Sequence, residues 1–166
     1  MTNKSENLEI VLPKNQLRLY GYEEYFTSFV NLHRKNKLPN TILLSGPKGL
    51  GKATFAYHFI NYILSYNESN KYSVDNMTIN PENNSYKSVS NNTNPNFSLL
   101  ESDMLGENIK IDKVRNILNF LNKSTYSSDI KIILIDSAEY LNLHSSNALL
   151  KALEESNNRT YFFIIH

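Results

Sequence analysis

One short loop holds the residues whose types and spacing can do chemistry. Gly46, Gly51 and Lys52 have the spacing G-x-x-x-x-G-K, after an apolar run at 42–44 and before a helical pattern. In such a loop backbone N–H groups surround phosphate oxygens, the lysine reaches the outer phosphates, and the helix N-terminus favours the anion. The alternative is a glycine-rich turn used only for packing, where Lys52 would meet no anion. The predicted nucleotide contacts are Gly46, Pro47, Lys48, Gly49, Leu50, Gly51, Lys52, Ala53 and Thr54.

An acidic residue further along the chain completes the predicted site. Asp136 ends the apolar run 131–135. Proteins that hydrolyse nucleotides with such a loop hold Mg²⁺ with an aspartate in that place, often through water. The alternative is a strand-end aspartate that caps the next turn, which would be the better interpretation without the loop. A glutamate that polarises the attacking water usually follows this aspartate, but here Ser137 follows, and Glu139 is too far along to point the same way.

Two departures from the motif therefore coincide. The motif ends in Ser or Thr, whose hydroxyl binds Mg²⁺, and this chain has Ala53 there. Thr54 cannot replace that hydroxyl, because one residue along a helix rotates a side chain by ~100°. Loss of the general base costs roughly 10²–10⁴ in rate. We expect the chain to bind ATP weakly or to hold it without hydrolysis, and we expect Mg²⁺ binding to be doubtful. No residue of the chain is expected to ligate a metal or to catalyse hydrolysis.

The remaining composition excludes several function classes. The chain has no cysteine, which excludes disulfides, thiol catalysis and cysteine-ligated zinc. Its four histidines are scattered, without metal spacing or a Ser/His/Asp arrangement. The net charge of +1 gives no global reason to expect nucleic-acid binding. Without a signal peptide or an apolar run of membrane length, the expectation is a cytoplasmic protein that does not contact membranes.

Apolar spacing predicts the elements that position these residues. The expected strands alternate with helices along the chain. This order predicts an α/β domain with a mostly parallel sheet flanked by helices. The predicted helix that ends at Glu155 has Ser145 or Ser146 as its cap. The expected strands are 41–45, 97–101, 131–136 and 160–165, and the other expected helices are 22–37, 53–64 and 111–121.

The predicted domain organisation has three parts. Residues 1–15 form a loose lead-in, and residues 16–166 form the nucleotide-binding domain. Within it, residues 66–96 include ten asparagines and are expected to be a mobile surface insertion. Because the sequence ends on the apolar strand 160–165, the domain is expected to be C-terminally incomplete.

Several stretches together carry a resemblance to a known family. They are 19–23, 37–40, 44–54, 94–97, 111–115, 135–142 and, most specifically, the Ser-Ser-Asn-Ala-Leu-Leu-Lys-Ala-Leu-Glu-Glu run at 145–155. With them the chain resembles the N-terminal AAA+ region of bacterial DNA polymerase III clamp-loader subunits, most of all the delta-prime type. The resemblance covers roughly residues 16–166, except for 66–93.

The resemblance implies a fold, a function and partners. It implies an AAA+ P-loop domain that works in DNA replication by supporting the ATP-driven loading of the sliding clamp onto primed DNA. The implied partners are gamma/tau and delta subunits, with the clamp and DNA contacted through the complex. Delta-prime subunits often have a degraded nucleotide site, which fits Ala53 and Ser137. The family's four-cysteine zinc module is not implied here, and Arg159 is not assigned the family's trans-acting arginine role.

Three alternatives stay open from the sequence. An active AAA+ ATPase of the gamma/tau type would need the metal ligand and the base that Ala53 and Ser137 replace. A P-loop kinase would need an acceptor site and phosphate-binding arginines in a lid. A remnant that never assembles would lack the lid and collar altogether.

Overall fold

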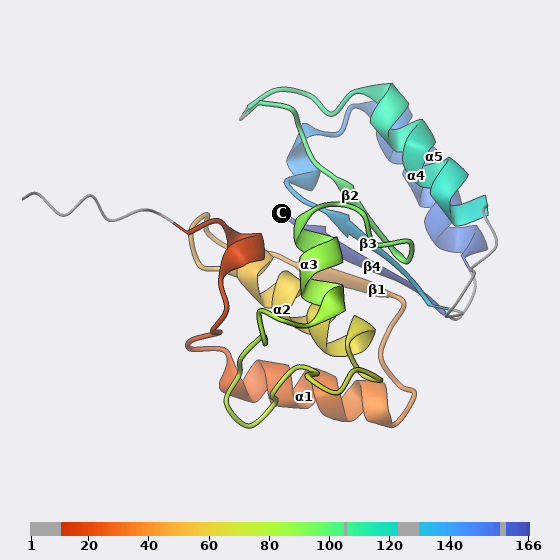
Figure 1. Cartoon of the computed structure of the whole chain (residues 1–166). Helices are drawn as coiled ribbons and strands as arrows, with labels where there is room; N and C mark the ends of the chain where they lie inside the picture. The colour runs from red at the N-terminus through yellow and green to blue at the C-terminus, as the bar shows by residue number, and fades with distance from the viewer. Residues whose placement is uncertain (1–10, 105, 123–129, 157–158) are drawn as a thin grey trace, which may run out of the picture.

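Three layers make up the structure, a computed structural model that describes residues 11–104, 106–122, 130–156 and 159–166. A four-stranded sheet lies between one pair of helices, α1 and α2, and another, α4 and α5 (Figure 1). The helices are α1 (Glu23–Arg34), α2 (Lys52–Leu64), α3 (Asn84–Ser90), α4 (Ile111–Asn122) and α5 (Leu143–Glu155). The strands are β1 (Thr41–Leu44), β2 (Phe97–Leu100), β3 (Lys131–Ile135) and β4 (Thr160–Ile165), and two 3₁₀ turns are η1 (Pro13–Asn15) and η2 (Ala138–Tyr140).

The sheet confirms the predicted fold class. Its order is β1-β4-β3-β2, and all three pairings are parallel. Every residue of β3 is buried, because its side chains alternate between the two cores: Ile132 and Leu134 face α2, while Ile133 and Ile135 face α4 and α5. Parallel strands end at one edge, so the loop after β1 and the residues after β2 and β3 lie at the same edge.

Aromatic rings join α1 to α2. Phe26 of α1 is fully buried, and its ring centroid lies 5.9 Å from Phe55 and 5.5 Å from Phe59 of α2. Tyr62 and Tyr72 complete the surroundings of Phe26 at 6.2 and 5.0 Å. The outer helix is thus held on the inner one mainly by ring packing.

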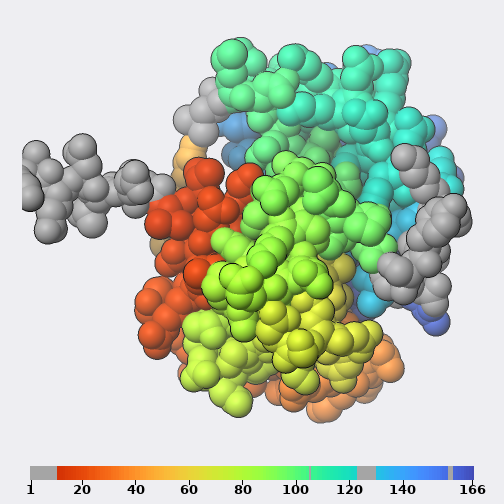
Figure 2. Space-filling model, viewed as in Figure 1, coloured from red at the N-terminus to blue at the C-terminus, as the bar shows by residue number. Residues whose placement is uncertain are grey.

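The segment 66–96 differs from the expected mobile insertion. It contains α3 and packs against α2, as the yellow-green surface in Figure 2 shows. Tyr72, Met77 and Ile79 are buried in the same core as α2. The prediction was wrong because many asparagines and neighbouring polar residues here serve as caps and paired amides rather than as solvated loop residues.

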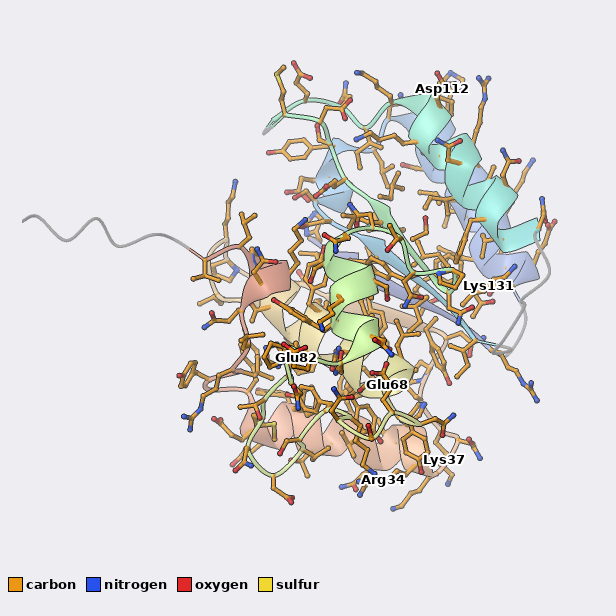
Figure 3. All side chains as sticks on the ribbon, in the orientation of Figure 1. Arg34, Lys37, Glu68, Glu82, Asp112 and Lys131 are labelled. Carbon is orange, nitrogen blue, oxygen red and sulfur yellow. The ribbon has the colours of Figure 1, made fainter. Side chains whose placement is uncertain are left out.

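Three polar contacts show how this segment is held. The Asn83 side chain accepts a hydrogen bond from the N–H of Tyr86 and so caps α3. The Asn83 amide also pairs with that of Asn61 in α2, at 3.1 and 3.2 Å. Glu68 accepts hydrogen bonds from the N–H groups of Asn84 and Ser85 in the first turn of α3 (Figure 3). The paired amides of Asn61 and Asn83 are buried, so their hydrogen bonds satisfy groups that folding removes from water.

The lead-in and the α5 cap also differ from expectation. Residues 1–10 lie outside the described part, but η1 is ordered against α3, where the Lys14 ammonium donates to the Ser90 carbonyl at 3.0 Å. The α5 cap is Asn142, which accepts from the N–H of Ser145, rather than Ser145 or Ser146. Ser145 is instead fully buried.

No described helix is long and apolar enough to cross a membrane.

A buried lysine starts β3. The Lys131 ammonium donates to the carbonyls of Phe120 and Leu121 at the end of α4, and it lies 5.6 Å from the centre of the Phe120 ring (Figure 3). A cation is favourable there because the carbonyls at a helix C-terminus carry partial negative charge. Lys131 thereby ties the sheet to α4.

A buried histidine should make stability depend on pH. His58 Nε2 lies 2.9 Å from the Gln16 carbonyl and Nδ1 lies 3.0 Å from the Tyr72 hydroxyl, so the neutral ring donates to Gln16 and accepts from Tyr72. Burial lowers the pKa of His58 to about 4, although the Gln16 bond opposes the shift. The unfolded chain, with a histidine pKa near 6.5, then binds more protons than the folded one between pH 6.5 and 4.

We expect the free energy of unfolding to fall as the pH drops through this window. His58 alone should account for roughly 3 kcal/mol at the acid end, at 1.36 kcal/mol per pKa unit. Urea denaturation of the wild type and of His58→Gln from pH 7.5 to 4 checks this. Only the wild type carries the titrating ring. Unfolding free energies of the two proteins that change in parallel with pH would therefore contradict the prediction.

Candidate functional site

The glycine loop lies between β1 and α2 at the carboxyl edge of the sheet. β1 ends at Leu44 and α2 begins at Lys52, each within one residue of the predicted bound. Gly49 and Gly51 have φ of 88° and 83°, a left-handed conformation that residues with a Cβ rarely adopt. A Cβ at Gly49 would meet nothing within 4 Å, so the backbone angle rather than space requires glycine there.

Lys52 points back across this loop. Its ammonium donates to the carbonyls of Gly46 and Pro47, the latter at 3.0 Å. In the described residues, the N–H groups of Lys52, Ala53 and Thr54 donate to no protein acceptor, as the first turn of a helix leaves them. A cation and several free donors therefore lie together on one exposed loop, which fits the phosphates of a nucleotide.

Asp136 lies at the same edge, directly after β3. Its N–H donates to the Leu100 carbonyl at 2.9 Å, and the Ser137 hydroxyl donates to its Oδ1 at 3.3 Å. Burial is the main reason why the pKa of Asp136 is raised, and Glu139 adds to the rise, whereas the Ser137 hydroxyl and Lys52 lower it. The electrostatic influence of Lys52 on Asp136 indicates that the fold brings both predicted parts of the site together.

A second acid near Asp136 was missed from the sequence. Glu101 directly follows β2, and the pairing of Leu100 with Ile135 sets it beside Asp136. Burial and then the charge of Asp136 raise the pKa of Glu101, while Lys113 and Lys14 lower it. The available signal was an acidic last residue in the second predicted strand, 97–101, because parallel strands end at one edge.

The residues at the two replaced positions fit Mg²⁺ poorly. Ala53 packs against the core of α2 and offers no oxygen. Thr54 lines a pocket with Tyr22 and Leu50. Ser137 has φ of 62° and its hydroxyl donates to Asp136, and the following Glu139 is exposed. Among the described residues, no three His, Asp or Glu side chains gather closely enough to hold a metal.

A pocket of about 410 Å³ adjoins the loop. Its lining includes the aromatic rings of Tyr20 and Tyr22, together with Leu19, Leu50 and the polar Gln16 and Arg18. This mixture of aromatic, apolar and few polar groups suits a flat heterocycle beside the phosphates. A larger hollow of about 620 Å³, between α4 and α5, includes neither loop residues nor Asp136.

Comparison with known proteins adds to this geometry. The family model described as "DNA polymerase III, delta subunit" matches residues 21–166. The delta' subunit of DNA polymerase III from Pseudomonas aeruginosa is 28% identical over 123 residues, which cover 74% of this chain and 36% of that protein. The gamma/tau subunit from Mycoplasma genitalium is 30% identical over 144 residues, which cover 87% of this chain and 23% of that protein.

The fold has a solved relative. A crystal structure of a DNA polymerase III gamma subunit-related protein from Thermotoga maritima matches 82% of this chain and 38% of its own, with a TM-score of 0.50 and 22% identity. This likeness supports the AAA+ fold, and the chain spans little more than a third of the length of the delta' relative from Pseudomonas. Because the family model matches residues 21–166, the chain belongs to the DNA polymerase III delta subunit family, and a delta' subunit is among the proteins it resembles.

Proposed function

We propose that the chain supplies the AAA+ region of a clamp-loader subunit that supports loading of the sliding clamp onto primed DNA without hydrolysing ATP itself. One observation carries the proposal: the loop keeps a geometry suited to phosphate, while Ala53 and Ser137 stand where a metal ligand and a water-activating glutamate are needed. The chain acts with gamma/tau and delta subunits in the cytoplasm, and it meets the clamp and DNA through that complex.

Reconstitution tests this function. Clamp loading onto primed DNA is measured with gamma/tau and delta subunits from the same organism, with and without this chain. Addition of the chain is expected to raise the loading rate, because the complex then contains the proposed AAA+ region. Equal rates with and without the chain would contradict the proposal.

The family assignment argues against a P-loop kinase, but a gamma/tau-type ATPase stays as the alternative. The identity of 30% with a gamma/tau subunit favours it. The replaced residues Ala53 and Ser137 oppose it, because a motor needs both groups.

Nucleotide binding gives a second test. Lys52→Ala is expected to weaken binding of a fluorescent ATP analogue by about 10- to 100-fold, since hydrogen bonds from a charged donor to phosphate are lost. Removal of Mg²⁺ with EDTA should change the wild-type affinity by less than about threefold, because Ala53 offers no metal ligand and Asp136 alone binds a metal weakly.

The matched control is Lys48→Ala in the same loop. Lys48 is exposed, and its ammonium donates to no described acceptor, so its loss should have a much smaller effect than the loss of Lys52. Complete loss of binding in EDTA, or equal effects of the two lysine variants, would show that the phosphate site is not built as proposed.

A further inference from the structure

Tyr22 was not among the predicted site residues, yet it contacts the glycine loop directly. Its hydroxyl donates to the Leu50 carbonyl at 2.6 Å. Its ring lies beside Gly51, where a Cβ would stand 3.7 Å from Tyr22 Cε2. Tyr22 is the residue just before α1, and it lies 28 positions before Leu50 in the sequence.

The contact constrains one peptide group of the loop. In a trans peptide unit the C=O and the following N–H point in opposite directions, and the described peptide bonds are all trans. Since the Leu50 carbonyl faces the Tyr22 hydroxyl, the N–H of Gly51 faces away from Tyr22. Among the described residues this N–H donates to no backbone acceptor, which leaves it available to an anion on the side of the loop away from Tyr22.

Tyr22 is itself held firmly. Its carbonyl accepts the first hydrogen bond of α1, from the N–H of Phe26 at 2.8 Å. Its ring packs 5.4 Å from the ring of Phe55 in α2. Phe55 in turn donates its N–H to the Gly51 carbonyl at 2.9 Å, so the peptide groups on both sides of Gly51 are fixed.

The geometry points to Tyr22 as a positioning residue that holds the Leu50 carbonyl and thereby aims the Gly51 N–H at a phosphate of the bound nucleotide. This inference rests on the proposed function, because it requires a phosphate ligand in the loop. It adds a link between α1 and the loop that no residue of the G-x-x-x-x-G-K motif supplies.

Tyr22→Phe tests the inference, because it removes the hydroxyl and keeps the ring. Titrations of the whole chain use ATP and tripolyphosphate, which has the phosphates without the base. Tyr22→Phe is expected to weaken both by a similar factor, about threefold to tenfold, with the melting temperature of the free protein unchanged. A role in folding alone would lower the melting temperature and leave both affinities as they are, which would overturn the inference.

One matched variant serves as a control. Tyr25 lies in α1, three residues after Tyr22, and its hydroxyl donates to no described acceptor, so Tyr25→Phe should not change tripolyphosphate binding. If Tyr22→Phe weakens ATP but not tripolyphosphate, Tyr22 contacts the base and the inference is wrong. If the wild type binds neither ligand, the proposed phosphate site fails and this inference with it. If the wild type binds both and Tyr22→Phe binds them equally well, only this inference fails.

Discussion

Phe26→Ala is expected to lower the free energy of unfolding by about 3–5 kcal/mol, the range for loss of a buried aromatic side chain. Phe26 is fully buried, and its ring contacts the rings of Phe55 and Phe59 in α2 and of Tyr72. Its removal leaves a cavity that the rings around it cannot fill without moving both helices. Urea denaturation followed by circular dichroism measures the loss.

The matched control is Tyr25→Ala, on the same helix. The Tyr25 side chain is 65% exposed, so its truncation should change the unfolding free energy by no more than about 0.5 kcal/mol. If both variants lose the same amount, α1 is not held by the ring cluster. A loss in Phe26→Ala below about 1 kcal/mol would lead to the same conclusion.

The sequence predicted the sheet and its flanking helices well, for a physical reason. The run at 132–135 is apolar on both faces because β3 is covered by helices on both sides, and such a strand is recognisable from its residues alone. The helical stripe at 111–121 is as clear, since α4 has one buried face with Val114 and Ile117. The order of strand, glycine loop and helix also located the candidate phosphate site.

The prediction failed where tertiary contacts decide the outcome. The asparagines of 66–96 suggested a loop, but Asn83 both caps α3 and pairs with Asn61, a partner 22 positions away. Glu101 gained significance only through the pairing of β2 with β3. Tyr22 lay in the predicted helix 22–37 and in the resembling stretch 19–23 but received no role at the site, because its contact with Leu50 joins segments 28 positions apart. Local patterns do not contain such pairings.

We expect no ATP turnover above background from this chain, even when the nucleotide is bound. The position after Asp136 is Ser137, whose hydroxyl donates to that aspartate and cannot accept a proton from the attacking water as a carboxylate does. Loss of such a base costs roughly 10²–10⁴ in rate. Ala53 removes a metal oxygen as well. Release of labelled phosphate at saturating ATP, compared with Lys52→Ala, measures turnover.

ATP turnover above background would need another carboxylate as the base, and Glu101 is the candidate. It lies beside Asp136 on the neighbouring strand, and its raised pKa suits a group that accepts a proton. Turnover lost in both Lys52→Ala and Glu101→Gln would therefore contradict the prediction and assign the base to Glu101. Turnover that survives in Lys52→Ala would instead come from a contaminating enzyme, because Lys52 is the cation of the phosphate site.

Ala53→Ser separates the effects of the two replaced positions. This variant should make ATP binding depend on Mg²⁺ while phosphate release stays at background, because a metal ligand without a base does not activate water.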